Sequence, residues 1–300
     1  MLLLAGFPVL IFVMLWAFFA VLDMQTYAGD WYNAPINVES SFTETLIYSP
    51  YIFGGVAIWF LIAWFFHQRM INRATGAVAV SRAEQPEVYN LLENLCVSRG
   101  MAMPQLYIIE SDALNAYASG LKEKDYSITL TTGIIKKLNQ EELEAVIGHE
   151  LTHIMNRDVR LLVISIIFVG ILSFLSEMAF RALLRSGGRS RKNGGIIIVI
   201  ALLILLVGYL FATLIRFALS RKREYLADAG AVELTKNPSA MVAALEKISG
   251  HSEIEGAPRE VAQMFIEHPP KMNFMRTGFF SIFATHPPIE KRIEVLKAMV

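Results

Sequence analysis

The stretch Val146-Ile147-Gly148-His149-Glu150-Leu151-Thr152-His153 decides both the fold and the chemistry of this chain. Two histidines four apart lie on one face of a helix, one turn above the other, so both imidazoles can reach a single ion. The glutamate between them lies to one side, where it can face a water molecule without binding the metal. This HExxH pattern is typical of a zinc hydrolase, which uses two imidazole ligands, an open position and a carboxylate base.

The helix that carries this pattern has a clear start in the sequence. Asn139 is a favourable N-cap, and Glu142 three residues later completes a capping-box pair. An apolar stripe runs along the helix from Leu143 to Ile154, and the two histidines lie outside it. Their position off the stripe favours a metal site over two structural histidines.

Four apolar runs surround this helix, at residues 2–22, 51–66, 161–175 and 196–217. With 54% hydrophobic residues, the chain is too apolar for an ordinary soluble enzyme, and about 20 apolar residues suffice to span a bilayer. The first run lacks a basic start, which favours an anchor over a cleaved signal peptide. A net charge of zero gives no reason to expect a nucleic-acid partner, and a single cysteine excludes an intrachain disulfide. We therefore expect an integral membrane protein in contact with the lipid bilayer.

The charges beside these runs predict an orientation. The loop between the first two runs carries acidic residues and no Lys or Arg, whereas Arg69, Arg73 and Arg82 follow the second run. The positive-inside rule therefore places the chain from residue 67 onward in the cytoplasm. If the third and fourth runs both span the membrane, the basic stretch at 185–192 between them lies outside, against this rule. Whether these two runs cross the membrane fully therefore stays open.

The fold class expected is α+β, mostly helical, with a small sheet and about four transmembrane or membrane-associated helices. We predict a helix from Pro86 to Gly100, strands at 106–110 and 126–132, and helices near 241–248 and 289–300. The HELTH helix should continue without interruption into the third apolar run. These elements suggest four parts: an N-terminal transmembrane hairpin at 1–67, the first part of a catalytic domain at 68–158, a hydrophobic helical hairpin at 159–217, and the second part of the catalytic domain at 218–300.

A catalytic zinc site usually has three protein ligands, so one more residue is needed. The third and fourth apolar runs are joined by a short polar loop and should form an antiparallel hairpin, whose two ends meet. This hairpin brings Glu224 to the end of the HELTH helix. Asp228 follows on the same face, where it can hydrogen-bond the far nitrogen of a ligating histidine. The plainer alternatives are a charge cluster of Glu224 with Arg221 and Arg223, and a simple helix-face carboxylate for Asp228.

The order of HExxH, hairpin and ExxxD resembles the HtpX-like membrane zinc endopeptidases. The resemblance extends to both pairs of apolar runs and to Ile154 and Asp158 after HELTH. It also extends to Asn115–Ala118, to the sequence SRKREYLAD at 220–228, and to Thr285-His286-Pro287-Pro288 followed by Lys291-Arg292-Ile293. It implies that His149, His153 and Glu224 bind one Zn²⁺, that Glu150 is the general base, and that Asp228 supports a ligand from behind.

The same resemblance implies a substrate-binding strand and a further catalytic residue. Asn115, Ala116, Tyr117 and Ala118 would form an edge strand that pairs with the substrate backbone, and His286 would support the oxyanion. Plainer alternatives stay open: Asn115 as a turn residue, Tyr117 as a packing residue, and His286 as a loop histidine. His268 offers a second His-Pro-Pro.

By this resemblance the chain is a bacterial-type zinc endopeptidase of the inner membrane. It would degrade misfolded or damaged membrane proteins at the cytoplasmic face under stress, so its partners would be polypeptide substrates and lipid. Two alternatives are a prenyl-protein processing protease, whose greater number of spans argues against it, and a zinc-binding membrane scaffold without catalysis.

Overall fold

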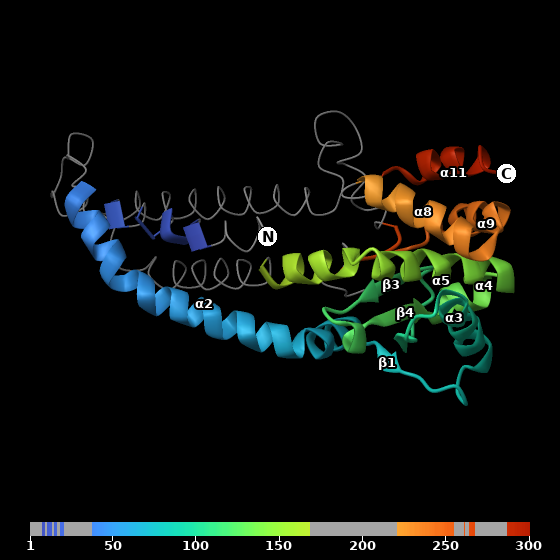
Figure 1. The fold of residues 1–300 in the computed structure, drawn as a ribbon, viewed down its shortest axis with the longest axis horizontal. Helices are drawn as coiled ribbons and strands as arrows, with labels where there is room; N and C mark the ends of the chain where they lie inside the picture. The colour runs from blue at the N-terminus through green and yellow to red at the C-terminus, as the bar shows by residue number, and fades with distance from the viewer. Residues whose placement is uncertain are drawn as a thin grey trace, which may run out of the picture. The chain divides into compact units, whose positions relative to one another are not determined.

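The computed structural model describes residues 8–9, 11–13, 15–16, 19–20, 38–168, 221–254, 261, 264–267 and 287–300. The chain divides into two compact units, Met1–Ala63 with Phe168–Leu214 and Trp64–Ile167 with Ile215–Val300. The second unit holds the sheet and the described helices from α3 (Pro86–Arg99) onward (Figure 1). The fourth apolar run, residues 169–175 of the third and both His-Pro-Pro segments lie outside the described residues, except for Pro287 and Pro288.

A four-stranded mixed sheet has the strand order β1-β2-β4-β3. Its two central strands, β2 (Gln105–Ile109) and β4 (Ser127–Thr131), are parallel, and they confirm the two predicted strands. β3 (Ala116–Ser119) pairs with β4 in antiparallel fashion and lies at one edge. β1 (Val78–Ala79) lies at the other edge and was not predicted, because two residues are too short to show alternation.

Helices α3 (Pro86–Arg99), α4 (Thr132–Lys137) and α5 (Gln140–Met155) belong to the same core as the sheet. The predicted helix from Pro86 is confirmed, and it ends at Gly100, whose φ of 63° suits glycine. The capping box of α5 is also confirmed. The Glu142 amide donates to Asn139 Oδ1 and the Asn139 amide donates to Glu142 Oε2, both over 2.9 Å. The centre of this core consists of side chains without solvent exposure, among them Leu92, Ile128, Leu130, Ile147 and Leu151.

The expectation that α5 runs without interruption into the third apolar run is wrong. The helix ends at Met155, Asn156 and Arg157 form a turn, and the chain is helical again over 158–168. Arg157 has a φ of 60°, a left-handed conformation that is uncommon for a residue other than glycine. The turn interrupts the helix three residues after the second histidine.

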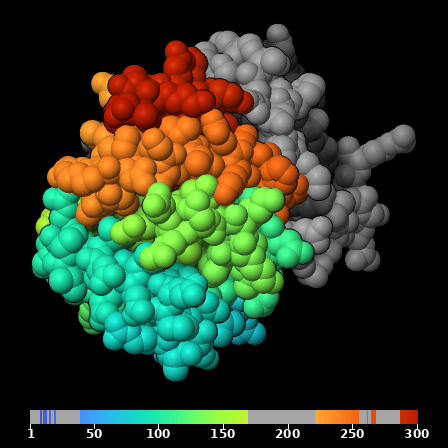
Figure 2. Space-filling model, turned by 90° about the vertical axis from the view of Figure 1, so that its right-hand side faces the viewer, coloured from blue at the N-terminus to red at the C-terminus, as the bar shows by residue number. Residues whose placement is uncertain are grey.

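Helices α8 (Arg221–Thr235), α9 (Pro238–Ile248) and α11 (Ile289–Lys297) form a second layer, and the predicted helices near 241–248 and 289–300 are thereby confirmed. α5 lies between the sheet with α3 on one side and α8 with α9 on the other, and α11 packs on α8 and α9 (Figures 1 and 2). Small residues let α5 and α8 approach closely: a Cβ built at Gly148 lies 3.5 Å from Ala231 Cα, and one built at Gly230 lies 2.4 Å from Thr152 Cγ2.

Helix α2 (Val38–Thr75) contains the predicted apolar run at 51–66 and extends it at both ends. Among the described residues it is the one helix long and apolar enough to cross a membrane. Only 11% of its most apolar window is buried, unlike the core helix of a soluble protein. Its C-terminal end contacts β3: Thr75 Oγ1 and Tyr117 Oη lie 3.0 Å apart, and Ser119 Oγ donates to Gln68 Oε1 over 2.9 Å.

Candidate metal centre

Three side chains from two helices converge on one point. α5 supplies His149 and His153, and α8 supplies Glu224, as the hairpin argument from the sequence predicted. The two Nε2 atoms are 3.2 Å apart. Glu224 Oε2 lies 3.7 Å from Nε2 of His149, and Glu224 Oε1 lies 3.5 Å from Nε2 of His153. Of these residues, His149 and Glu224 are buried and His153 is half-buried.

These distances fit a tetrahedral zinc ion. Ligand atoms at about 2.0–2.1 Å from a tetrahedral centre lie about 3.3–3.4 Å apart, close to the three separations found here. The imidazole orientations agree, because Nδ1 of His149 donates to Asp228 Oδ1 over 2.9 Å and Nδ1 of His153 to Asp158 Oδ2 over 3.3 Å. With both Nδ1 atoms protonated, the two Nε2 lone pairs point at each other beside a carboxylate. Such an arrangement suits a shared cation.

Each histidine thus has its own carboxylate, and each carboxylate has its own arginine. Arg292 of α11 donates to Asp228 twice, from Nε over 2.8 Å and from Nη2 over 2.6 Å. Arg223 Nη1 lies 3.4 Å from Asp158 Oδ1. The first pair is almost fully buried, whereas Asp158 and Arg223 keep 15% and 25% side-chain exposure. The structure therefore brings Asp228 to the position expected from the sequence and adds Asp158, Arg223 and Arg292, to which the sequence analysis gave no role in a metal centre.

Neighbouring charges set the pKa values in this cluster. Burial lowers the pKa of His153, but the hydrogen bond to Asp158 and the charges of Glu224 and Glu150 outweigh burial and raise it to about 9. Burial raises the pKa of Asp228, yet Arg292 and His149 bring it below its ordinary value. Burial likewise lowers the pKa of Arg292, and Asp228 more than compensates. In this centre, buried negative and positive charges lie next to one another, as is usual where charged groups are buried in a protein.

Glu150 is buried beside the three converging side chains. Burial raises its pKa, and the nearby positive charges of His149 and His153 only partly oppose this effect. The amide of Ala118 in β3 donates a hydrogen bond to its carboxylate. A carboxylate with a raised pKa, within the field of two histidines, is suited to accept a proton and to return it near neutral pH.

A role for Arg292, which the sequence analysis quoted only as part of the family resemblance, was missed because this residue lies in a helix with the pattern of ordinary surface structure. In α11 it shares the stripe of Ile289, Ile293 and Leu296, with spacings of three and four residues. A charged residue on the apolar stripe of a short helix was the available signal, since arginine is rarely buried without a partner. Its exposed fraction is 1%.

The four residues expected to bind substrate lie at and just before the edge strand β3, and part of that edge is covered. The amide of Ile266 donates to Ala116 O and to Asn115 Oδ1, both over 3.1 Å. Nδ2 of Asn115 donates to Ser252 O over 2.6 Å, so the whole Asn115 side chain is engaged within the fold. Tyr117 is 1% exposed and packs on Phe265. Ala118 is the strand residue whose backbone reaches Glu150.

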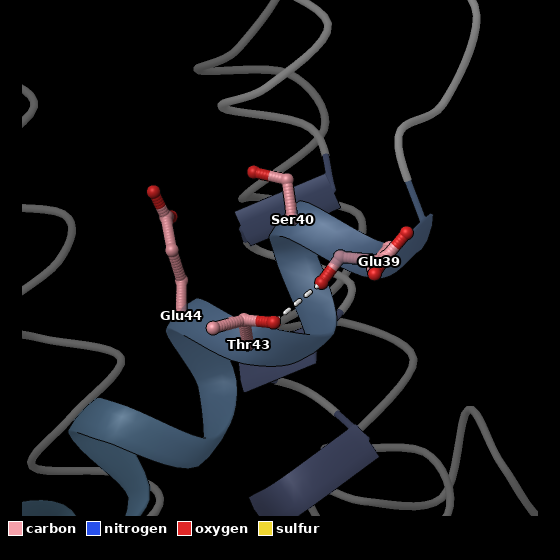
Figure 3. Close-up of a pocket in the computed structure, with 4 residues that line it drawn as sticks. All are labelled: Glu39, Ser40, Thr43 and Glu44. Atoms are coloured by element: carbon pink, nitrogen blue, oxygen red, sulfur yellow. Dashed lines mark hydrogen bonds between the residues drawn. The ribbon is translucent and has the colours of Figure 1, made fainter.

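His286 and His268 lie outside the described residues, so the expected role of His286 stays a prediction. A hollow at the start of α2 is lined by Glu39, Ser40, Thr43 and Glu44 (Figure 3). There, Thr43 Oγ1 donates to Glu39 O over 2.8 Å. This hollow has carboxylates but no imidazole or thiol. Within the described part of the chain, the one group of three metal-binding side chains is the centre on α5 and α8.

Comparison with known proteins gives three findings. A family model described as Peptidase family M48 matches residues 82–300. The Protease HtpX homolog of Bacteroides fragilis (strain YCH46) is 52% identical over 300 residues, which cover 97% of this chain and 92% of that protein. The Protease HtpX homolog of Lactobacillus helveticus (strain DPC 4571) is 38% identical over 254 residues, which cover 82% of this chain and 84% of that protein.

A solved structure is also similar, the crystal structure of S. mikatae Ste24p, with 19% sequence identity and a TM-score of 0.45. The match covers 85% of this chain but only 64% of that one, so this chain spans under two thirds of its length.

Proposed function

The chain belongs to peptidase family M48 as an HtpX homolog, and from this premise we propose that it is a membrane-anchored zinc endopeptidase that cleaves damaged or misfolded membrane proteins at the cytoplasmic face. A metallopeptidase of this family acts on polypeptides. The observation that carries the proposal is the triangle of His149, His153 and Glu224 with buried Glu150 beside it. A non-catalytic zinc-binding scaffold would not require a buried carboxylate beside the metal ligands.

The proposal assigns one role to each residue of the centre. His149, His153 and Glu224 would hold the zinc ion through Nε2, Nε2 and a carboxylate oxygen. A bound zinc ion supplies Lewis acidity, which polarises the scissile carbonyl and makes water acidic enough to attack near neutral pH. Glu150 accepts the proton of the attacking water and then delivers it to the leaving amine. The products are one carboxylate and one amine, and no covalent enzyme intermediate forms.

Substrate binding is proposed to use the part of the β3 edge that Ile266 does not cover. A peptide that adds to a sheet edge is held through its backbone, so little of its sequence is read. Because Ile266 already covers the carbonyl of Ala116, the pairing would use the Ala118 end, next to Glu150. His286 is proposed to support the oxyanion during the attack.

The membrane setting supports the choice of substrate. α2 provides one helix of spanning length and composition, and we propose that the other apolar runs complete about four spans. The parts proposed are the anchor at 1–67, the split catalytic domain at 68–158 and 218–300, and the hydrophobic hairpin at 159–217. Arg69, Arg73 and Arg82, in the last part of α2 and just after it, support a position of the catalytic part in the cytoplasm of a bacterial-type cell. A site tied to α2 through β3 would meet substrates at the bilayer surface.

The test is a pair of measurements on the full chain in detergent. Glu150→Gln should keep one equivalent of zinc and lose turnover of an unfolded substrate by at least about 100-fold, as expected when a general base is removed. Glu141→Gln, on the exposed face of the same helix, is the matched control and should keep both the zinc ion and the turnover of wild type. A Glu150→Gln enzyme that cleaves at the normal rate would refute the assignment. Wild-type protein that binds no zinc would refute the whole proposal.

A further inference from the structure

The carboxylate behind His153 comes from a residue that neither the HExxH nor the ExxxD pattern contains. Asp158 Oδ2 lies 3.3 Å from Nδ1 of His153, and both side chains are 15% exposed. The contact matches the one between Asp228 and His149, where the distance is 2.9 Å. Each of the two histidines of the centre is therefore oriented by a separate carboxylate.

This contact depends on the turn after α5. In an unbroken helix, a residue five positions after His153 would lie about 140° around the axis and about 7.5 Å along it, out of reach of the imidazole. Here the helix ends at Met155, and Arg157 adopts a φ of 60° before the chain becomes helical again at 158. The turn thus brings the Asp158 carboxylate next to the imidazole of His153.

The second oxygen of Asp158 faces the other ligand-bearing helix. Arg223 Nη1 lies 3.4 Å from Asp158 Oδ1, and Arg223 immediately precedes Glu224 in α8. One carboxylate therefore contacts a ligand on α5 and the neighbour of a ligand on α8. The distance of 3.4 Å is long for a charge-assisted hydrogen bond, so this ion pair is a weak one.

We propose that Asp158 is a positioning residue of the metal centre, which fixes the tautomer and the ring orientation of His153 so that Nε2 faces the ion. The inference rests on the proposed function, because it concerns the same zinc ligands. Carboxylates in this position strengthen a histidine ligand, and their loss weakens metal binding by about 10–100-fold. The competing interpretation is that Asp158 only begins the helix at 158 and pairs with Arg223, which is a structural role.

The experiment measures zinc affinity by competition with a chelator, and thermal unfolding of the metal-free protein, both on the full chain. Asp158→Ala should bind zinc about 10–100-fold more weakly. Asp158→Asn keeps a neutral acceptor for Nδ1 and should fall between wild type and Asp158→Ala. Arg223→Gln breaks the ion pair but leaves the carboxylate on His153, so its zinc affinity should stay within about threefold of wild type. Asp112→Asn, on an exposed aspartate, is the control and should change nothing.

Two results would overturn the inference. The first is an Asp158→Ala protein whose zinc affinity lies within twofold of wild type. The second is equal loss in Asp158→Ala and Arg223→Gln, which would assign the effect to the ion pair. If Asp158→Ala fails to fold, the comparison of Asp158→Asn with Arg223→Gln still decides between the two roles. Wild-type protein without zinc binding would instead count against the proposed function, so the two failures are distinguishable.

Discussion

A single methyl group placed between α5 and α8 should open the metal centre. A Cβ at position 230 would lie 2.4 Å from Thr152 Cγ2, 2.6 Å from its Oγ1 and 3.0 Å from its Cβ. Carbon atoms in contact prefer about 3.5–4.0 Å, so the helices must separate by roughly 1 Å or Thr152 must move. Thr152 cannot turn away at low cost, because it is 4% exposed, β-branched, and bonded through Oγ1 to Gly148 O over 2.8 Å.

The separation matters because the ligands lie on both helices. Metal–ligand distances tolerate only about ±0.2 Å, several times less than the movement that Gly230→Ala would force. We therefore expect Gly230→Ala to lower the unfolding free energy by about 1–3 kcal/mol, as for other overpacked cores, and to weaken zinc binding at least tenfold. The assays are chemical unfolding of the metal-free protein and zinc competition with a chelator.

The same interface provides the control and the rescue. A Cβ at Gly148 would meet Ala231 and Thr235 at 3.5–3.7 Å, an ordinary contact, so Gly148→Ala should be tolerated despite its position next to His149. Thr152→Ala in the Gly230→Ala background removes the two closest atoms and should restore most of the zinc affinity. Wild-type zinc affinity in Gly230→Ala, or equal damage from Gly148→Ala, would refute the reasoning.

Two further predictions concern the buried charges. Because the folded pKa of metal-free His153 is raised to about 9, its stabilising contribution is full below about pH 6.5 and is lost as pH rises through about 9. Zinc needs the neutral imidazole, so zinc affinity measured by competition should rise about tenfold per pH unit from pH 7 to 9, and a flat profile would contradict the shifted pKa. Arg292→Met leaves Asp228 buried without its arginine partner and should lower the free energy of unfolding by about 3–5 kcal/mol in chemical unfolding. Lys291→Met, on the exposed side of α11, should lower it little. Equal losses in the two variants would contradict this account.

Local sequence signals predicted most of the elements around the site. The capping box of Asn139 and Glu142 marked the start of α5, and the glycine after Arg99 marked the end of α3. Glu224 was predicted from topology alone, since an antiparallel hairpin must bring its two ends together. Such predictions work because caps and periodicity are short-range properties of the chain.

The features that the sequence did not reveal depend on long-range contacts or on strain. The turn at Asn156 and Arg157 contains neither glycine nor proline, so Asn156 was a weak local signal that the helix stops there. Arg292 is 64 positions from Asp228, and a charged residue in a short C-terminal helix is ordinarily solvated. Ile266 covers Ala116 through a backbone hydrogen bond between residues 150 positions apart in the sequence. Such a bond does not depend on side chains, so the sequence does not show it.

The support for the centre is spread along the chain, and this spacing has a consequence for biosynthesis. Arg292 lies 143 positions after His149, and α11 follows every other helix of the centre. Until the ribosome has released α11, Asp228 lacks the arginine that compensates its burial, so the histidine it orients is not yet fixed. During synthesis the two histidines proposed to bind zinc are therefore present long before Arg292 can help to fix their orientation. We therefore expect zinc binding and proteolytic activity to appear only after α11 has been synthesised.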